Sequence, residues 1–167
     1  MPRCDNARMD TVVLVEGISD RIALETLAQL RGVELDIVPM GGAHAIRRFL
    51  ARYADAHVIG LCDAGERSVF ERAGVERFEV CDADLEDELI RALGPARVQE
   101  VLAEHDADAF RTFQRQPQWR GRPVHEQLRR FLCSADNRKL RYVPVLVGEA
   151  VDRGCVPAPL EAVLCAV

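Results

Sequence analysis

The acidic residues of this chain gather where predicted strands end. Glu16 directly follows an aliphatic run at 12–15, and Asp20 comes four residues later. Asp63 follows a second apolar run, at 58–62. Open parallel sheets bind ligands at the carboxyl ends of their strands, so these carboxylates fall where chemistry is expected. Two strands that each end in an acid predict a site for a divalent metal ion.

A third acidic cluster, residues 82–88, has five acids in seven positions. Asp84 and Glu86 follow another predicted strand end, so they can face the same edge of the sheet. Asp87 and Glu88 are better explained as the solvated start of a helix, whose dipole stabilises negative charge. Carboxylates gathered this closely repel one another by roughly 1 kcal/mol per pair in water. Mg²⁺ or Mn²⁺ would remove that cost, because both suit all-oxygen ligands.

Some of these acids also have a purely structural explanation. Asp20 would lie in the first turn of a helix capped by Ser19, where the helix dipole favours a negative charge. Asp63 would cap the short helix that follows it. These explanations account poorly for Glu16, which belongs to the end of a strand.

A basic stretch follows the acidic part of the chain. Residues 1–110 carry 12 Arg and Lys against 22 Asp and Glu, a net charge of −10, whereas residues 111–153 carry 10 against 4, a net charge of +6. Such asymmetry indicates a polyanionic partner, and a site built from acids needs a separate basic surface to hold nucleic acid. The arginines predicted to contact a phosphate backbone are Arg111, Arg115, Arg120, Arg122, Arg129, Arg130, Arg138 and Arg141.

Two other residues of the basic stretch have two interpretations each. Lys139, in the run 138–142, is either a solvated or phosphate-contacting residue or, near a metal cluster, a group that stabilises charge on a scissile phosphate. Trp119 lies in a predicted loop at 117–123, where it either stacks on a base or packs against the helical half. Both choices depend on where the fold places these side chains.

Motifs of several other enzyme classes are absent from the sequence. There is no GxxxxGK[ST] or GxGxxG motif, the four histidines show no HExxH spacing, and the three serines have no nucleophile-elbow context. The six cysteines form no CxxC pair, so a zinc site is not predicted. Cys62 and Cys81 are expected to be small, reduced core residues. Metal-assisted phosphoryl transfer is the chemistry that remains.

Strand and helix patterns alternate over the first half of the chain and predict an α/β fold. The predicted strands are residues 12–15, 35–39, 57–62 and 78–81, and the predicted helices between them are residues 18–31, 43–53 and 66–73. The connecting loops are short, which favours right-handed parallel crossovers, with strand three beside strand one.

From residue 84 onward the patterns are helical. Residues 140–151 suit a helix in which Pro144 causes a kink or marks the first turn, and a strand at 143–147 is the alternative. We expect one domain of 167 residues, with an α/β core at 11–94 and a helical, basic part at 95–167.

The sequence gives no sign of a membrane protein. No apolar run approaches the roughly 18 residues that a membrane span requires. The polar N-terminus, residues 1–10, is expected to be neither a signal peptide nor an anchor. We therefore expect a cytoplasmic protein without a membrane partner.

At these positions the sequence resembles the Toprim domains of the OLD-family (overcoming lysogenization defect) nucleases. Residues 13–20 are similar to the strand-one signature of that family, and residues 61–63 to the start of its DxD element. Residues 84–89 and 138–142 are similar to its two later elements. The four matches follow the family's order between residue 11 and about residue 153. The resemblance implies a Rossmann-like Toprim fold, a sheet of about four parallel strands flanked by helices, with a two-metal site that cleaves the DNA backbone.

The resemblance also implies roles for individual residues. Glu16, Asp63 and Lys139 would be catalytic, with Lys139 stabilising the transition state. The residues implied to bind Mg²⁺ or Mn²⁺ are Glu16, Asp20, Asp63, Asp84 and Glu86, with Glu66 as a replacement ligand.

Two departures from the family pattern leave alternatives open. Gly65 stands where the DxD element has its second Asp, so one metal loses a ligand unless Glu66 or water replaces it. The larger family members carry an ABC-type ATPase ahead of this domain and this chain has none, so we expect a free-standing Toprim protein that works with a separate ATPase or helicase.

The leading hypothesis is a Mg²⁺- or Mn²⁺-dependent endonuclease that acts on DNA or RNA. The alternative is a non-catalytic module that binds nucleic acid or a partner through a degenerate metal site. A phosphoacceptor signalling domain is a third class, in which Asp84 and Glu86 would have no role.

Overall fold

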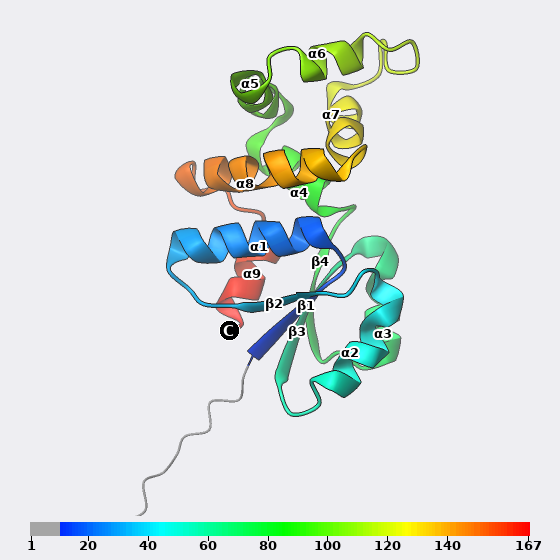
Figure 1. Cartoon of the computed structure of the whole chain (residues 1–167), viewed down its shortest axis with the longest axis vertical. Helices are drawn as coiled ribbons and strands as arrows, with labels where there is room; N and C mark the ends of the chain where they lie inside the picture. Colours follow the sequence, from blue (N-terminus) through cyan, green and yellow to red (C-terminus); the bar gives the residue numbers. More distant parts are fainter. Residues whose placement is uncertain (1–10) are drawn as a thin grey trace, which may run out of the picture.

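A computed structural model of the chain describes residues 11–167 (Figure 1). The prediction that residues 1–10 are neither a signal peptide nor an anchor concerns residues outside this range. Between residues 11 and 167, no helix combines the length and the apolar character that crossing a bilayer requires.

The centre of the fold is a four-stranded parallel sheet with the strand order β2-β1-β3-β4. The strands are β1 (Thr11–Val15), β2 (Asp36–Pro39), β3 (His57–Asp63) and β4 (Arg77–Cys81). After β1 the chain forms β2 on one side and then crosses to the other side for β3, so the strand order reverses between β1 and β3. Ligands of open α/β sheets bind at such a switch point, at the carboxyl ends of the strands. The predicted α/β class and the pairing of strands one and three are confirmed.

Helices cover both faces of the sheet and form most of the second half. They are α1 (Ile18–Arg31), α2 (Ile46–Arg52), α3 (Arg67–Ala73), α4 (Leu85–Leu93), α5 (Pro95–His105), α6 (Ala109–Gln114), α7 (Val124–Cys133), α8 (Asp136–Asp152) and α9 (Ala158–Cys165), with short 3₁₀ turns η1 (Ala43–Ala45) and η2 (Ala64–Glu66). The turns η1 and η2 come directly before α2 and α3, so each of the corresponding predicted helices begins with a tighter turn. The predicted helical C-terminal half is confirmed.

The two faces of the sheet are set by the alternation of side chains along each strand. Val13 and Ile59 are fully buried in a core that includes residues of α1, α9 and the helices of the second half. Leu14 faces the other way, into a smaller core under α2 and α3 (Figure 1). On that side a Cβ at Gly60 would lie 2.8 Å from the ring of Phe70, so only glycine lets α3 approach the sheet this closely.

Helix α8 is the element that brings the second half of the chain to the first. It lies along α1 (Figure 1), with Leu146 and Val147 fully buried. Pro144 lies inside α8, so the helix prediction is confirmed, and both the strand alternative and the placement of Pro144 in the first turn are wrong. Proline has no N–H to donate, so the carbonyl of Leu140 lacks its helical donor. The first turn of α8, with Lys139, reaches the carboxyl edge of the sheet.

The sequence did not predict α9. This helix is short, and Glu161 is its one charged residue. Without a polar face, its apolar residues show no helical period that a sequence reading can detect. In the fold it packs against β3 and β4, with Leu160 and Val163 fully buried.

Candidate metal centre

The switch point of the sheet holds Glu16 and Asp63. Glu16 directly follows β1, and Asp63 is the last residue of the neighbouring strand β3. The backbone N–H of Asp63 donates a hydrogen bond of 2.8 Å to Glu16 Oε1. This bond joins the ends of the two strands and fixes the Glu16 carboxylate at the point where the fold favours ligand binding.

Asp20 reaches the same place from the start of α1. The N-cap of α1 is Gly17, so the prediction that Ser19 caps the helix is wrong. The helix begins at Ile18, which places Ser19 in its first turn. The Asp20 carboxylate accepts a hydrogen bond of 3.0 Å from the Gly17 N–H. Asp20 therefore stabilises the helix start, as its structural explanation predicted, and is also buried beside Glu16.

Asp84 and Glu86 approach from the start of α4. Asp84 is the N-cap of α4, and its Oδ1 accepts a hydrogen bond of 2.8 Å from the Asp87 N–H. Glu86 is 2 % exposed, and its Oε1 has no hydrogen-bond partner among the described residues. Lys139 Nζ lies 3.3 Å from that oxygen, close enough for charge compensation but without hydrogen-bond geometry. Buried carboxylate oxygens without partners are rare in folded proteins, and a cation would supply the missing partner.

One cavity of about 370 Å³ joins these groups. The charged residues that line it are Glu16, Asp20, Asp63, Asp84, Glu86 and Lys139. The structure therefore brings together five of the six predicted metal ligands and the predicted catalytic lysine. The sixth, Glu66, is half-buried in η2 outside the lining of the cavity. It is close enough for its charge to raise the pKa of Glu16.

The proximity of these carboxylates changes their protonation. Burial, and then the charges of Asp20 and Glu16, raise the pKa of Asp63 to about 8. Burial is also the main reason why the pKa of Asp20 is raised to about 7, with smaller contributions from Glu86 and Glu16. The pKa of Glu16 is raised as well, chiefly by burial. Five acids around one cavity therefore repel one another, and an oxygen-seeking divalent cation fits this donor set.

These pKa values predict how the stability of the metal-free protein depends on pH. The pKa values of Asp20 and Asp63 lie above the ordinary value of 3.8, so the folded protein binds more protons than the unfolded chain. The resulting stability is fully present below that ordinary value and is lost as the pH rises through about 7 and 8. We expect Tm in the presence of a chelator to fall by roughly 4 °C or more between about pH 5.5 and about pH 8.5.

Calorimetry on the full chain would measure this fall in Tm. Mn²⁺ should restore Tm most strongly at the alkaline end of the range, because it binds the ionised carboxylates. In the double variant Asp20→Asn, Asp63→Asn the pH dependence should be much flatter. A Tm that rises with pH in the metal-free wild type would contradict the prediction.

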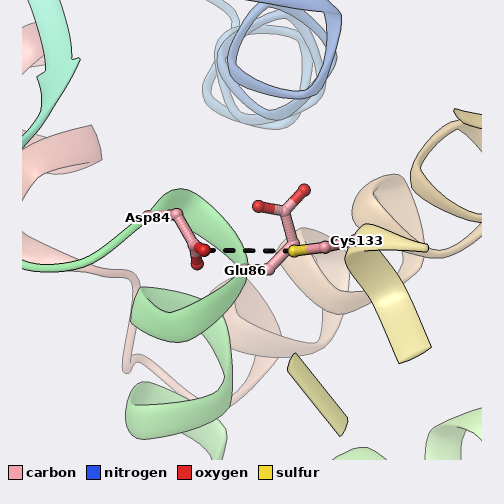
Figure 2. Close-up of side chains that lie close together, drawn as sticks. All are labelled: Asp84, Glu86 and Cys133. Atoms are coloured by element: carbon pink, nitrogen blue, oxygen red, sulfur yellow. Dashed lines mark hydrogen bonds between the residues drawn. The ribbon is translucent and has the colours of Figure 1, made fainter. Parts of the chain in front are cut away.

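Sequence reasoning missed Cys133 as a residue of this site. Its thiol, at the end of α7, lies beside the carboxylates of Asp84 and Glu86, and the ligand atoms of the three residues are all within 4.8 Å of one another (Figure 2). Burial, and then the charges of Glu86 and Asp84, raise the pKa of the thiol to about 12. A lone cysteine far from the acids in sequence carries no motif that could have revealed this contact.

Asp87 and Glu88 face away from the cavity, and their predicted place at a helix start is confirmed. Their side chains are 13 % and 12 % exposed, so the prediction that they are solvated is wrong. Asp87 Oδ1 pairs with His125 Nε2 at 2.6 Å, and Glu88 accepts a hydrogen bond from the Asp82 N–H. The His125 contact holds the start of α4, and with it Asp84 and Glu86, against α7.

A groove lined by arginines and acids adjoins the acidic cavity. It has a volume of about 560 Å³ and shares Asp84 and Cys133 with that cavity. Three of the predicted phosphate-binding arginines, Arg122, Arg129 and Arg130, line it. Asp84, Asp87 and Glu126 line it as well. Arg129 pairs with Asp84 at 2.7 Å and Arg122 with Glu126 at 3.6 Å, so Arg130 is the groove arginine without an ion-pair partner among the described residues.

The other predicted arginines lie farther along the surface. Arg138 lines a neighbouring pocket with Arg130 and stacks over the ring of Phe131 at 4.1 Å. Arg111 is exposed on α6, and Arg115 and Arg120 are exposed on the loop beyond it. Arg141 turns to Asp106, at 3.5 Å, and lines neither the cavity nor the groove.

Trp119 packs against the helical half, as one of its two interpretations predicted. Its ring stacks on Phe113 with 5.2 Å between centroids, and Arg122 lies over it at 5.6 Å. The exposed part of its side chain lines the groove that holds Arg122, Arg129 and Arg130.

The sheet order, the acids at the β1/β3 switch point and the later acidic pair at the start of α4 agree with a Toprim fold. A family profile described as "Overcoming lysogenization defect protein-like, TOPRIM domain" matches residues 9–63. No curated protein sequence matches the chain. The chain thus resembles the Toprim domains of the OLD family, and the predicted resemblance is confirmed.

Solved structures agree with this assignment of the fold. The C-terminal region of the Burkholderia pseudomallei OLD protein superposes with a TM-score of 0.61 at 16% sequence identity, over 92% of this chain and 93% of that one. The C-terminal region of the Xanthomonas campestris pv. campestris OLD protein gives a TM-score of 0.58 at 17% identity, over 93% of this chain and 92% of that one. The similarity extends over the helical half as well as the sheet.

Proposed function

We propose that this protein hydrolyses phosphodiester bonds in DNA with Mg²⁺ or Mn²⁺. The observation that carries the proposal is the convergence of Glu16, Asp20, Asp63, Asp84 and Glu86 on one cavity, which adjoins a groove with three arginines. Bound there, the cations would activate water and stabilise the charge that develops on the scissile phosphate. The buried oxygen of Glu86, which accepts no hydrogen bond from the described residues, and the mutually repelling carboxylates both support a cation at this place.

The residues of the chain have separate tasks in this proposal. Glu16 and Asp63 would hold one cation at the switch point, with Asp20 beside them. Asp84 and Glu86 would hold a second one. Burial lowers the pKa of Lys139, but the attraction of Glu86 and other acids outweighs burial, so the pKa is raised. Lys139 therefore remains charged and stabilises the leaving oxygen.

The groove residues bind the substrate. Arg122, Arg129 and Arg130 would contact phosphates on the way into the cavity. Such contacts position a nucleic acid without reading its sequence, so we expect binding that weakens steeply with salt and discriminates poorly between sequences. RNA is the other substrate that this groove chemistry admits.

We further propose that the chain acts as one domain, in the cytoplasm and with a separate ATPase or helicase. The continuous core supports the first part, because it runs from Val13 and Ile59 in the sheet to Phe131 and Leu146 in the second half. The solved OLD structures to which the chain is similar are C-terminal regions of their proteins, which supports a partner for the domain.

Nicking of supercoiled plasmid by the purified full chain is the direct test of the proposed function. We expect relaxed product with Mn²⁺ or Mg²⁺ and none with a chelator. Loss of this product at high salt would be consistent with binding through phosphates. Absence of nicking with every divalent cation, at low salt, would refute the proposal.

Gly65 favours a second candidate function, a non-catalytic module that binds nucleic acid or a partner. A carboxylate is missing at this position, and no other described residue takes its place in the cavity. The structure makes its restoration simple, because a Cβ at Gly65 would meet open space and its φ lies outside the left-handed region.

The variant Gly65→Asp distinguishes the two functions. If the wild type is an enzyme, it nicks plasmid by itself. Gly65→Asp should then change the nicking rate by less than about tenfold, which is the smallest change usually caused by losing a group that supports a metal ligand. If the site is degenerate, only the variant nicks. Gly65→Asn, which has the same shape without the charge, is the matched control.

A further inference from the structure

A thiol lies among the carboxylates at the α4 side of the cavity. Cys133 Sγ is 3.9 Å from Asp84 Oδ2 (Figure 2), and the third ligand atom, from Glu86, is within 4.8 Å of both. Oxygen and sulfur ligands of a tetrahedral zinc ion stand roughly 3.5 Å apart, given the usual bond lengths. Small inward movements of these three side chains would therefore bring them to coordination distance.

The burial of Glu86 is a second observation that favours a cation at this point. Its side chain is 3 % exposed, and Oε1 has no hydrogen-bond partner among the described residues. Lys139 Nζ, 3.3 Å from this oxygen, compensates part of its charge, but a buried oxygen that accepts no hydrogen bond remains costly. A cation bound by Glu86 and Cys133 would supply the direct contact that the oxygen lacks.

The surroundings of Asp84 already resemble those of a metal ligand. Its Oδ1 accepts from the Asp87 N–H at 2.8 Å, and its Oδ2 accepts from Arg129 Nε at 2.7 Å. Carboxylates that bind metals are themselves held by such hydrogen bonds, and an ionised carboxylate has lone pairs for both kinds of partner. The orientation of Asp84 is therefore fixed before a cation binds.

We propose that Asp84, Glu86 and Cys133 form a mixed oxygen–sulfur site for one thiophilic divalent cation, Zn²⁺. Cysteine sulfur and carboxylate oxygen are both zinc ligands, whereas Mg²⁺ selects oxygen alone. Three protein ligands leave a fourth position open toward the cavity, which is the arrangement of catalytic rather than structural zinc. The sequence did not predict zinc, because Cys133 belongs to no CxxC pair.

This site deepens the proposed function and rests on it for its role. It would be the second cation position of the metal centre, beside the all-oxygen position of Glu16 and Asp63. The centre would then hold two different metals. Cys133 would supply, from α7, a ligand for the position that Asp84 and Glu86 share.

Titration of the reduced, metal-free full chain with Co²⁺, a spectroscopic substitute for Zn²⁺, tests the site without an activity measurement. We expect a thiolate-to-cobalt charge-transfer absorption that saturates at one equivalent. Zn²⁺ should abolish it, and a large excess of Mg²⁺ should leave it. The absorption should be lost in Cys133→Ser and kept in the control Cys155→Ser.

Two outcomes would overturn the proposal: no charge-transfer absorption in the wild type, or the same absorption in Cys133→Ser. Glu86→Gln keeps the shape of the side chain and should weaken Co²⁺ binding at least tenfold, and this variant decides the matter if Cys133→Ser fails to fold. Failure of the proposed function is distinguishable, because the absorption would then appear in a protein that nicks no plasmid. Nicking with Mg²⁺ by a protein without the absorption would refute only the zinc site.

Discussion

Replacing Asp63 by alanine is expected to lower metal-dependent plasmid nicking by at least about 100-fold, since loss of residues that merely support a metal ligand already costs 10–100-fold. Asp63 ends β3 at the switch point and faces the other four carboxylates across the cavity. Without the Asp63 carboxylate, a cation at the switch point would keep Glu16 as its one ligand from the strand ends. Initial rates of plasmid relaxation, at saturating Mn²⁺, measure the effect.

The same substitution should not damage the fold. Burial and neighbouring charges raise the pKa of Asp63 to about 8, so ionisation of Asp63 destabilises the metal-free protein. We expect Tm of Asp63→Ala at alkaline pH, without metal, to be equal to or above that of the wild type. The matched control is Asp55→Ala, an exposed acid just before the opposite end of the same strand, which should leave the nicking rate unchanged. A nicking rate in Asp63→Ala equal to that of the wild type would remove Asp63 from the metal centre.

Replacing Lys139 by methionine is expected to lower the nicking rate by about 100- to 1000-fold, the usual cost of losing one group that stabilises transition-state charge. The substitution keeps the length of the side chain and removes the charge that lies 3.3 Å from Glu86 Oε1. It should also lower Tm, because Glu86 then loses its compensating charge while buried. The lysine side chain is 24 % exposed, so solvent limits this loss to about 1–3 kcal/mol.

A double variant separates the two effects of Lys139. Adding Glu86→Gln to Lys139→Met removes the uncompensated charge and should restore most of Tm, but the double variant should remain inactive. Arg153→Met, at the far end of α8 in an ion pair with Glu149, is the control for removing a positive charge from the same helix. Normal nicking by Lys139→Met would show that the lysine serves the stability of Glu86 and not catalysis.

The sheet was predictable because its signals are local. Each strand is a short apolar run that ends in an acid or a glycine, and every predicted strand is within one residue of the observed one at both ends. The acids of the site were predictable for the same reason, since parallel strands bring their carboxyl ends to one edge. Glu16, Asp63 and Asp84 each lie at or just after a strand end.

The remaining parts of the site depend on packing between distant helices. Cys133 meets Asp84 and Glu86 only because α7 packs against α4, and Lys139 meets Glu86 only because α8 packs against α4 and α1. No periodicity in the sequence encodes these contacts. For Lys139 a family resemblance supplied the role, whereas Cys133 matches no family element and was missed. Glu66 shows the opposite error of local reasoning, because it is near the acids in sequence but outside the lining of the cavity.

Asp63 donates a hydrogen bond to Glu16 through its main chain, so the roles of the two carboxylates can be tested separately. The donor is a peptide N–H, which every residue except proline would supply at position 63. Substitutions of Asp63 therefore remove its carboxylate from the centre and leave the orientation of the Glu16 carboxylate unchanged. The same bond orients the Glu16 side chain before a cation binds. Cation binding therefore costs little further side-chain entropy at Glu16.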